Sequence, residues 1–402
     1  MIGSRYLRCT AVVAVALFSG TLVASYGAPA TTSSAAVAAE HLAPIKIGVI
    51  STETSSTGQN TDGQVTAQRW QTYINSHGGI AGHPVEIIFK DDGDNPATAA
   101  QDFAELQQQG VIAIGDDSLV DSAFKSAADA AHIPVIGLGQ SSASTLYGSD
   151  PNFFTGFGTV TPNAYWGEAE LAKQAHDKTM GFIYCSEIPL CAQASAGTAP
   201  FAEKMGIKAS FKVAASSSAP NYTAQCLAAK DAGVDFLIVA LLGSGGRNVV
   251  NDCAAQGYYP TVPLGGPNSG PAFIDNPNLH NAVGEAGTIP YFVKNEATAA
   301  FHKVMNSYIP HASSADTLMT TWVGLEIISE ALAKVGAKTP TAADLYTGLY
   351  ALKGTNLGGL TQTLHFVKGQ PVKQSCAFYY SLINHKLVTP EGTKPVCPPA
   401  NV

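Results

Sequence analysis

The chain has 402 residues, of which 46 % are hydrophobic and only 13 % are charged, whereas charged residues usually make up roughly 25 % of a soluble protein. Its formal net charge of −8 at pH 7 argues against a nucleic-acid partner, because phosphate binding needs a basic face. The length allows two lobes, each with a hydrophobic core of its own.

Residues 1–39 have the composition of a signal peptide followed by a flexible tail. Arg5 and Arg8 precede an apolar run at 11–18, and small-residue cleavage sites follow it. The run is shorter than the about 20 residues that a membrane span needs, so an uncleaved anchor is the less favoured alternative. We therefore expect an exported protein, either periplasmic or extracellular at the cell surface.

The cysteines support an oxidising compartment. Cys9 lies before the apolar run, and an even number of cysteines remains in the rest of the chain, as is typical of disulfide-bonded exported proteins. A metal site is less favoured, because the sequence has no Cys-x-x-Cys motif and no pair of histidines at a helix-face spacing. We expect no metal and no cofactor. Proximity in sequence favours the disulfides Cys185–Cys191, Cys226–Cys253 and Cys376–Cys397.

From residue 45 onward, short apolar segments typical of strands alternate with alanine-rich segments typical of helices. The strands expected in the first part of the chain are 45–50, 85–89, 111–114, 133–137 and 152–157. The helices expected between them end near 75, begin near 96 and span 122–131. This alternation is typical of a parallel α/β sheet.

A second series of the same kind begins after Pro162. Its expected helices are 163–176, 192–205, 222–232 and one from near 247, and its expected strands are 180–185, 207–213, 236–242 and 262–264. The chain is expected to return to the first series at 285–292. Two further helices are expected at 315–335 and 342–352, and two closing strands at 358–366 and 376–383.

Two such series joined by chain crossings predict an α/β fold of two Rossmann-like lobes, each with a parallel central sheet, connected by a hinge of crossing strands. We expect lobe 1 to comprise 44–160 plus 286–365, and lobe 2 to comprise 161–285 plus 366–397. Parallel sheets bind small molecules at the carboxyl ends of their strands. A cleft between the lobes is therefore the expected binding site.

Three segments together resemble a known family. The strand at 45–49, the segment Gly78-Gly79-Ile80-Ala81-Gly82 and the pair Asp91-Asp92 before Pro96 resemble the leucine/isoleucine/valine-binding type of substrate-binding protein of ABC transporters, which has the type I periplasmic-binding-protein fold. The resemblance covers nearly all of the mature chain. It implies a two-lobed clamp that closes around a small molecule and presents it to a membrane permease without chemical reaction. We expect this protein to be a monomer.

The resemblance and the positions of the loops at strand ends suggest which residues bind the ligand. Hydroxyls and backbone N–H groups at helix N-termini suit an anionic group on a ligand, although Asp117 and Ser118 also have the character of helix caps. The expected ligand-binding residues are Gln59, Asn60, Asp117, Ser118, Gln140, Ser141, Ser142, Tyr184, Ser186, Gly243, Asn268 and Ser269.

The sequence departs from the family pattern at three of these positions. Asp117 follows another aspartate where the family has serines, Asn268 replaces the acid that pairs with an amino acid's ammonium, and Gly243 replaces a tyrosine. An amino-acid or amide-like solute is one possible ligand under this reading. A neutral, polyhydroxylated or cationic small molecule is equally compatible with these residues.

Two other functions are compatible with parts of the sequence. A ligand-sensing receptor of the same fold would signal to a membrane partner instead of delivering cargo. A serine hydrolase is a remote alternative, because Ser141 lies in Gly139-Gln140-Ser141-Ser142-Ala143, which resembles a degenerate nucleophile elbow. No histidine lies in a recognisable partner motif, so an enzyme is not expected.

Overall fold

The computed structural model describes residues 42–55, 58–139, 145–157, 163–187, 189–373 and 375–399. The expected signal segment, as well as Gln140, Ser141 and Ser142, lies outside these residues.

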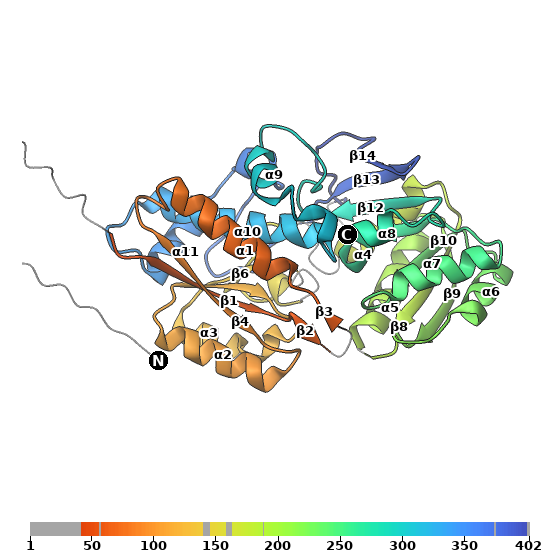
Figure 1. The fold of residues 1–402 in the computed structure, drawn as a ribbon, viewed down its shortest axis with the longest axis horizontal. Helices are drawn as coiled ribbons and strands as arrows, with labels where there is room; N and C mark the ends of the chain where they lie inside the picture. Colours follow the sequence, from red (N-terminus) through yellow and green to blue (C-terminus); the bar gives the residue numbers. More distant parts are fainter. Residues whose placement is uncertain are drawn as a thin grey trace, which may run out of the picture. The chain divides into compact units, whose positions relative to one another are not determined.

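The first sheet is entirely parallel, with the strand order β4-β1-β5-β6-β7 (Figure 1). Its strands are β1 (Ile45–Ser51), β4 (Val85–Asp91), β5 (Ala113–Asp117), β6 (Val135–Gly137) and β7 (Phe153–Phe154). A short hairpin of β2 (Thr54–Ser55) and β3 (Gly58–Gln59) follows β1. The hairpin occupies the segment in which the sequence predicted only a loop.

Helices cover both faces of this sheet, because successive side chains of a strand point to opposite sides. Ile47 and Val49 of β1 pack with Trp70 on one face, whereas Ile50 packs with Phe103 on the other. The first face is covered by α1 (Asp62–Ser76), α10 (Ala315–Val335) and α11 (Ala342–Ala351). The second face is covered by α2 (Pro96–Gln108), η1 (Asp121–Ala123) and α3 (Lys125–Ala131).

The second sheet is parallel at its centre and antiparallel at one edge. The group β9-β8-β10 meets the group β11-β12-β13-β14 where Leu237 donates a backbone hydrogen bond of 2.8 Å to the Thr261 carbonyl. The pairs β12–β13 and β13–β14 are antiparallel. Its strands are β8 (Thr179–Cys185), β9 (Lys208–Ala215), β10 (Phe236–Ala240), β11 (Val262–Leu264), β12 (Ala282–Ala286), β13 (Phe378–Ile383) and β14 (Lys386–Val388).

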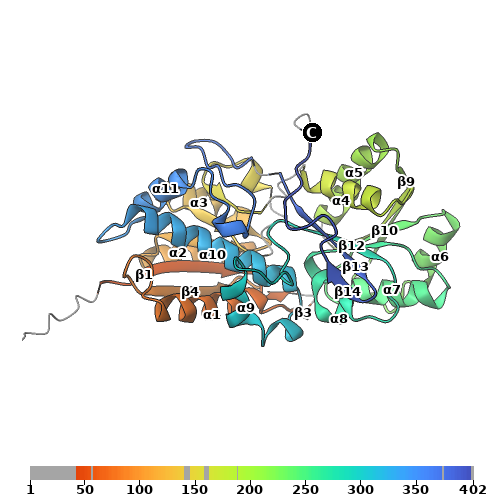
Figure 2. The same ribbon diagram turned by 90° about the horizontal axis from the view of Figure 1, so that it is seen from above.

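Figure 2 shows helices on opposite sides of the second sheet. One side is covered by α4 (Asn163–Gln174) and α5 (Pro189–Lys204). The other is covered by α6 (Thr223–Asp231), α7 (Gly245–Ala255) and the short α8 (Pro271–Ile274). The predicted α/β fold with parallel central sheets is confirmed, whereas the exact lobe boundaries stay a prediction.

The strand predicted at 358–366 is wrong. The 3-10 turn η6 (Leu357–Gly359) lies there instead, and Thr361 makes only an isolated bridge to Thr288. Gly358 and Gly359 have φ values of 70° and 108°, which are incompatible with an extended strand. The apolar side chains Leu364 and Phe366 are nevertheless buried, and this burial explains why the pattern resembled a strand.

Helix α10 has the bounds that the sequence predicted, because both of its ends carry clear signals. The Ser314 hydroxyl accepts a hydrogen bond from the Thr317 N–H at the N-cap, and Gly336 takes the left-handed conformation at the C-terminal end. The remaining helical segments are η3 (Leu146–Gly148), η4 (Gly266–Ser269), α9 (Ala299–Met305) and η5 (Ile309–His311). Within the described ranges, none of the helices combines the length and apolar character of a transmembrane span.

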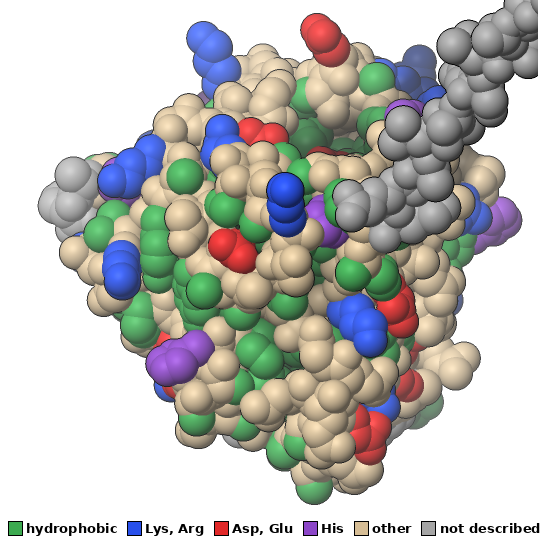
Figure 3. Space-filling model, turned by 90° about the vertical axis from the view of Figure 1, so that its left-hand side faces the viewer, with side chains coloured by type: hydrophobic (Ala, Val, Ile, Leu, Met, Phe, Trp, Pro, Cys, Tyr) green, Lys and Arg blue, Asp and Glu red, His purple; other side chains and the backbone are tan. Residues whose placement is uncertain are grey.

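The three predicted disulfides are present, and all of them join elements of the second sheet and its surroundings. Cys185–Cys191 links the end of β8 to α5, and Cys226–Cys253 links α6 to α7. Cys376–Cys397 fastens the C-terminal segment next to β13. On the face shown in Figure 3, acidic and basic side chains are interspersed and do not gather by sign.

Candidate functional site

The carboxyl ends of three neighbouring strands bring acidic and hydroxyl side chains together at one edge of the first sheet. In the parallel register, Ser51 of β1 lies beside both Asp91 of β4 and Asp117 of β5. Thr52 and Asp92 follow directly in the chain. This edge is where parallel sheets bind ligands.

Hydrogen bonds fix most of these carboxylates in place. Ser51 Oγ donates to Asp117 Oδ2 at 3.0 Å, and Thr52 Oγ1 donates to Asp92 Oδ1 at 2.8 Å. Ser118 Oγ donates to Asp92 Oδ2 at 2.5 Å. Both oxygens of Asp92 are therefore bonded, and the Ser118 hydroxyl proton is used within the protein.

Asp116, the neighbour of Asp117, faces the sheet's packed interior. Tyr147 OH donates to its Oδ2 at 2.5 Å and the Ser118 N–H donates to its Oδ1 at 3.0 Å. Burial raises the pKa of the Asp116 carboxyl well above its ordinary value, and the nearby Asp121 raises it further. Since Asp116 is fully buried, it supports the loop and is not a candidate ligand contact.

Glu53, in the loop after β1, is a candidate that the sequence patterns did not single out. Its side chain is only 6 % exposed, and its Oε1 accepts a 3.1 Å hydrogen bond from the Gln64 N–H in the first turn of α1. Burial raises the pKa of Glu53 to about 7, and Asp117 adds to the rise.

The first-loop residues predicted to bind ligand lie beside Glu53. The Asn60 N–H donates to the Glu53 carbonyl at 2.8 Å, and Asn60 Oδ1 accepts from the Asp62 N–H at 3.2 Å. Gln59 is exposed at the end of the β2–β3 hairpin. Asn60 thus shapes the entry to α1, while Gln59 is free to reach solvent.

Asp62 is a second residue that the sequence analysis missed. It is buried at the start of α1, where Oδ2 accepts from the Ser314 N–H at 2.7 Å and Oδ1 from Tyr308 OH at 3.0 Å. The next residue is Gly63, at which a Cβ would lie 2.3 Å from Asp117 Oδ2. A side chain there would displace Asp117, so a glycine keeps the acidic edge compact.

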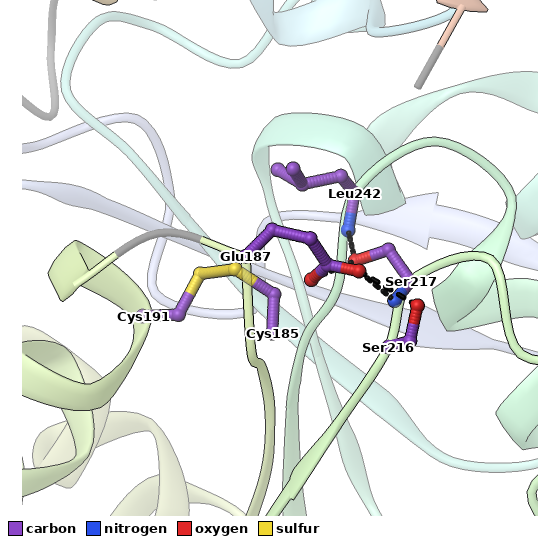
Figure 4. Close-up of a disulfide and its surroundings, with 6 residues drawn as sticks. All are labelled: Cys185, Glu187, Cys191, Ser216, Ser217 and Leu242. Atoms are coloured by element: carbon purple, nitrogen blue, oxygen red, sulfur yellow. Dashed lines mark hydrogen bonds between the residues drawn. A yellow bond between two sulfur atoms is a disulfide. The ribbon is translucent and has the colours of Figure 1, made fainter. Parts of the chain in front are cut away.

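At the second sheet, the loops that follow β8, β9 and β10 are tied to one another (Figure 4). Glu187 Oε1 accepts from Ser216 Oγ and from the Ser217 N–H, both at 2.8 Å. Ser217 Oγ accepts from the Leu242 N–H at 3.0 Å. The Cys185–Cys191 disulfide lies beside Glu187. Hydrogen bonds and a disulfide within the protein therefore connect the loops at the carboxyl edge of this sheet.

The predicted residues of the second sheet differ in their surroundings. Tyr184 is half-buried, whereas Ser186 and Gly243 are exposed at strand ends. Asn268 is buried, and its Nδ2 donates to the Val239 carbonyl at 3.2 Å. Ser269 is fully buried, and its Oγ lies 3.2 Å from Ser314 Oγ. Asn268 and Ser269 are thus bonded within the protein, and their ligand roles stay predictions.

No group of three or more histidine, cysteine or acidic side chains is arranged to hold a metal ion in the part of the chain that the structure describes. The acidic edge therefore consists of hydrogen-bonded single carboxylates, among them Glu53, whose Oε1 accepts from the Gln64 N–H.

The family model described as periplasmic binding protein matches residues 44–380. The chain belongs to the periplasmic binding protein family. This result confirms the resemblance seen in the sequence, and members of the family are extracytoplasmic solute-binding proteins.

Solved structures share the periplasmic-binding-protein fold at low sequence identity. A leucine-binding protein, LivK, from Thermotoga maritima is 14 % identical with a TM-score of 0.68, and the match covers 89 % of this chain and 100 % of that one. An extracellular ligand-binding receptor from Verminephrobacter eiseniae is 13 % identical with a TM-score of 0.70, covering 86 % and 99 %.

A fatty acid ABC transporter substrate-binding protein from Thermomonospora curvata is 18 % identical with a TM-score of 0.66, covering 86 % and 90 %. Among curated proteins, no sequence match to the chain was found. These structurally similar proteins bind different ligands by name, leucine and a fatty acid among them.

Proposed function

We propose that this protein is an exported solute-binding protein that captures a small polar molecule between its lobes and delivers it to the permease of an ABC transporter. The family and the fold support reversible capture without chemical reaction. The three disulfides support a location outside the cytoplasm. An amino-acid or amide-like solute remains within the proposed class.

The acidic edge of the first sheet narrows the proposal to a solute with a cationic nitrogen. The charged groups that act on Glu53 are Asp117, Asp91 and Asp62, all of them acidic. The ion pairs of the described residues involve Lys90, Lys125, Lys173 and Lys334, and none reaches these acids. A cationic nitrogen beside the Glu53 carboxyl group would offset this local excess of negative charge.

A thermal-shift screen tests the proposed function with matched pairs of compounds. Each pair has one member with a cationic nitrogen and one of similar size without it, such as putrescine and butanediol, or cadaverine and pentanediol. Leucine, which carries an ammonium group, and sugars and fatty acids, which do not, complete the screen. A ligand at 100 times its Kd stabilises the folded protein by about 2.7 kcal/mol. We expect stabilisation by cationic members only. Stabilisation by neutral members alone would contradict the cationic class, and the absence of any stabilisation would contradict capture of the solute classes in the screen.

Glu53→Gln should weaken binding of the stabilising cation by about 1 to 3 kcal/mol, because the amide removes a charge-assisted contact. Titration calorimetry at pH 8 measures the change in Kd. Since the pKa of Glu53 is about 7, native binding should also tighten from pH 6 to pH 8. Glu86→Gln, on the exposed side of β4, is the matched control. Equal Kd values for Glu53→Gln and the native protein would remove Glu53 from the site.

A further inference from the structure

The N-terminus of α10 is where elements of the two sheets meet through buried polar groups. Ser314 is the N-cap residue of this helix and is only 4 % exposed. It lies between α1, which covers the first sheet, and the turn η4, which follows β11 of the second sheet.

On the side of the first sheet, α10 is held firmly. The Ser314 N–H donates to Asp62 of α1 at 2.7 Å. Farther along the helix pair, Trp70 Nε1 donates to Glu326 at 2.9 Å, and the rings of Tyr73 and Trp322 lie 5.6 Å apart. Because apolar packing and hydrogen bonds act together here, α1 and α10 should move as one body.

On the side of the second sheet, the contacts are hydrogen bonds. Ser269 Oγ lies 3.2 Å from Ser314 Oγ and accepts a 3.2 Å bond from the Asp316 N–H. Tyr380 OH of β13 donates to Asp316 Oδ2 at 3.1 Å. A Cβ on Gly270 would lie 2.3 Å from the Ser313 carbonyl oxygen, so the two backbones touch at this point.

We propose that Ser269, Ser314, Asp316 and Tyr380 form a latch that fixes the orientation of the two lobes. Ser269, which the sequence placed among the ligand contacts, then acts as a positioning residue through Ser314 and Asp316. For the lobes to move about a hinge, the contacts between them must break and re-form with a small change in free energy. A single hydrogen bond has a small net free energy and meets this requirement. The inference rests on the proposed function only in taking the lobes to move relative to each other.

Distance measurement between the lobes tests the latch without any ligand. Spin labels are placed at Gln107→Cys on α2 and Glu203→Cys on α5, both exposed, in a full chain carrying Cys9→Ser. The other cysteines form disulfides. Pulsed electron–electron double resonance then measures the distribution of distances between the two spin labels. We expect one main distance in the native chain.

Ser269→Ala and Tyr380→Phe should each raise the population of a second distance by about fivefold or more, as loss of one hydrogen bond allows. The matched controls are Ser313→Ala, whose side chain is exposed, and Tyr379→Phe, whose hydroxyl has no hydrogen-bond partner among the described residues. Neither control should change the distribution. If Ser269→Ala fails to fold, the distance distribution of Tyr380→Phe is sufficient to test the latch.

Distributions of Ser269→Ala and Tyr380→Phe that superimpose on the native one would overturn the latch. This outcome is independent of the ligand screen. The spin-label distances test the latch without any ligand, whereas the thermal-shift screen tests the class of ligand, so either proposal can fail while the other holds.

Discussion

Replacing Gly79 by alanine is expected to lower the free energy of unfolding by about 3 kcal/mol or more, whereas the same change at Gly78 should cost only about 1 to 2 kcal/mol. Both glycines have positive φ, 71° and 95°, a conformation that disfavours any residue with a Cβ by about 1 to 2 kcal/mol. Only at Gly79 would the Cβ also meet a neighbour, at 1.9 Å from the His83 carbonyl oxygen.

That carbonyl cannot move away easily. It accepts the Ile80 N–H at 2.9 Å in the tight turn that leads into β4, so the clash adds an overpacking cost of about 1 to 3 kcal/mol. Urea unfolding followed by circular dichroism measures both variants, and Gly78→Ala serves as the control for the backbone effect. Equal losses at the two positions would show that the close approach at Gly79 carries no cost.

The second large effect concerns pH. Burial raises the pKa of Glu168 on α4 from 4.5 to about 7, against a hydrogen bond from Thr198 that lowers it. Burial and the neighbouring Glu168 raise the pKa of Glu285 on β12 as well. Both side chains lie at the interface between α4 and the second sheet, since Glu285 lies against Gly167.

Because the pKa of native Glu168 is above that of the unfolded chain, its contribution to stability is complete below about pH 4.5 and is lost as the pH rises to about 7. The shift corresponds to at most about 3 kcal/mol. Urea unfolding between pH 4.5 and pH 8 should therefore show stability falling with pH. Glu168→Gln should flatten this dependence, whereas exposed Glu203→Gln should leave it intact. An unchanged slope in Glu168→Gln would contradict the assignment.

The fold follows from the sequence wherever periodicity and end signals agree. Helix α10 begins after Ser314 and ends before Gly336 as predicted, because both residues have a local structural role. The false strand at 358–366 and the unpredicted β14 depend on tertiary contacts. β14 pairs antiparallel with β13, and its Leu387 packs against the core; its three residues carry too little periodicity to be predicted as a strand.

The candidate site was predicted less completely, for a physical reason. The sequence predicted a strand that ends at residue 114, whereas β5 runs to Asp117. The Ser118 hydroxyl donates to Asp92, which follows another strand. Glu53 and Asp62 gain their significance from burial and from contacts such as that of Asp62 with Ser314, 252 residues away in the chain. No local pattern records such contacts.

The order of elements along the chain has a consequence for biosynthesis. The face of the first sheet that carries Ile47 and Val49 is covered partly by α10 and α11, which come only after residue 314. A chain that emerges N-terminus first presents that apolar face long before its cover exists. Until α10 has been synthesised, this exposed apolar face makes the growing polypeptide prone to aggregation.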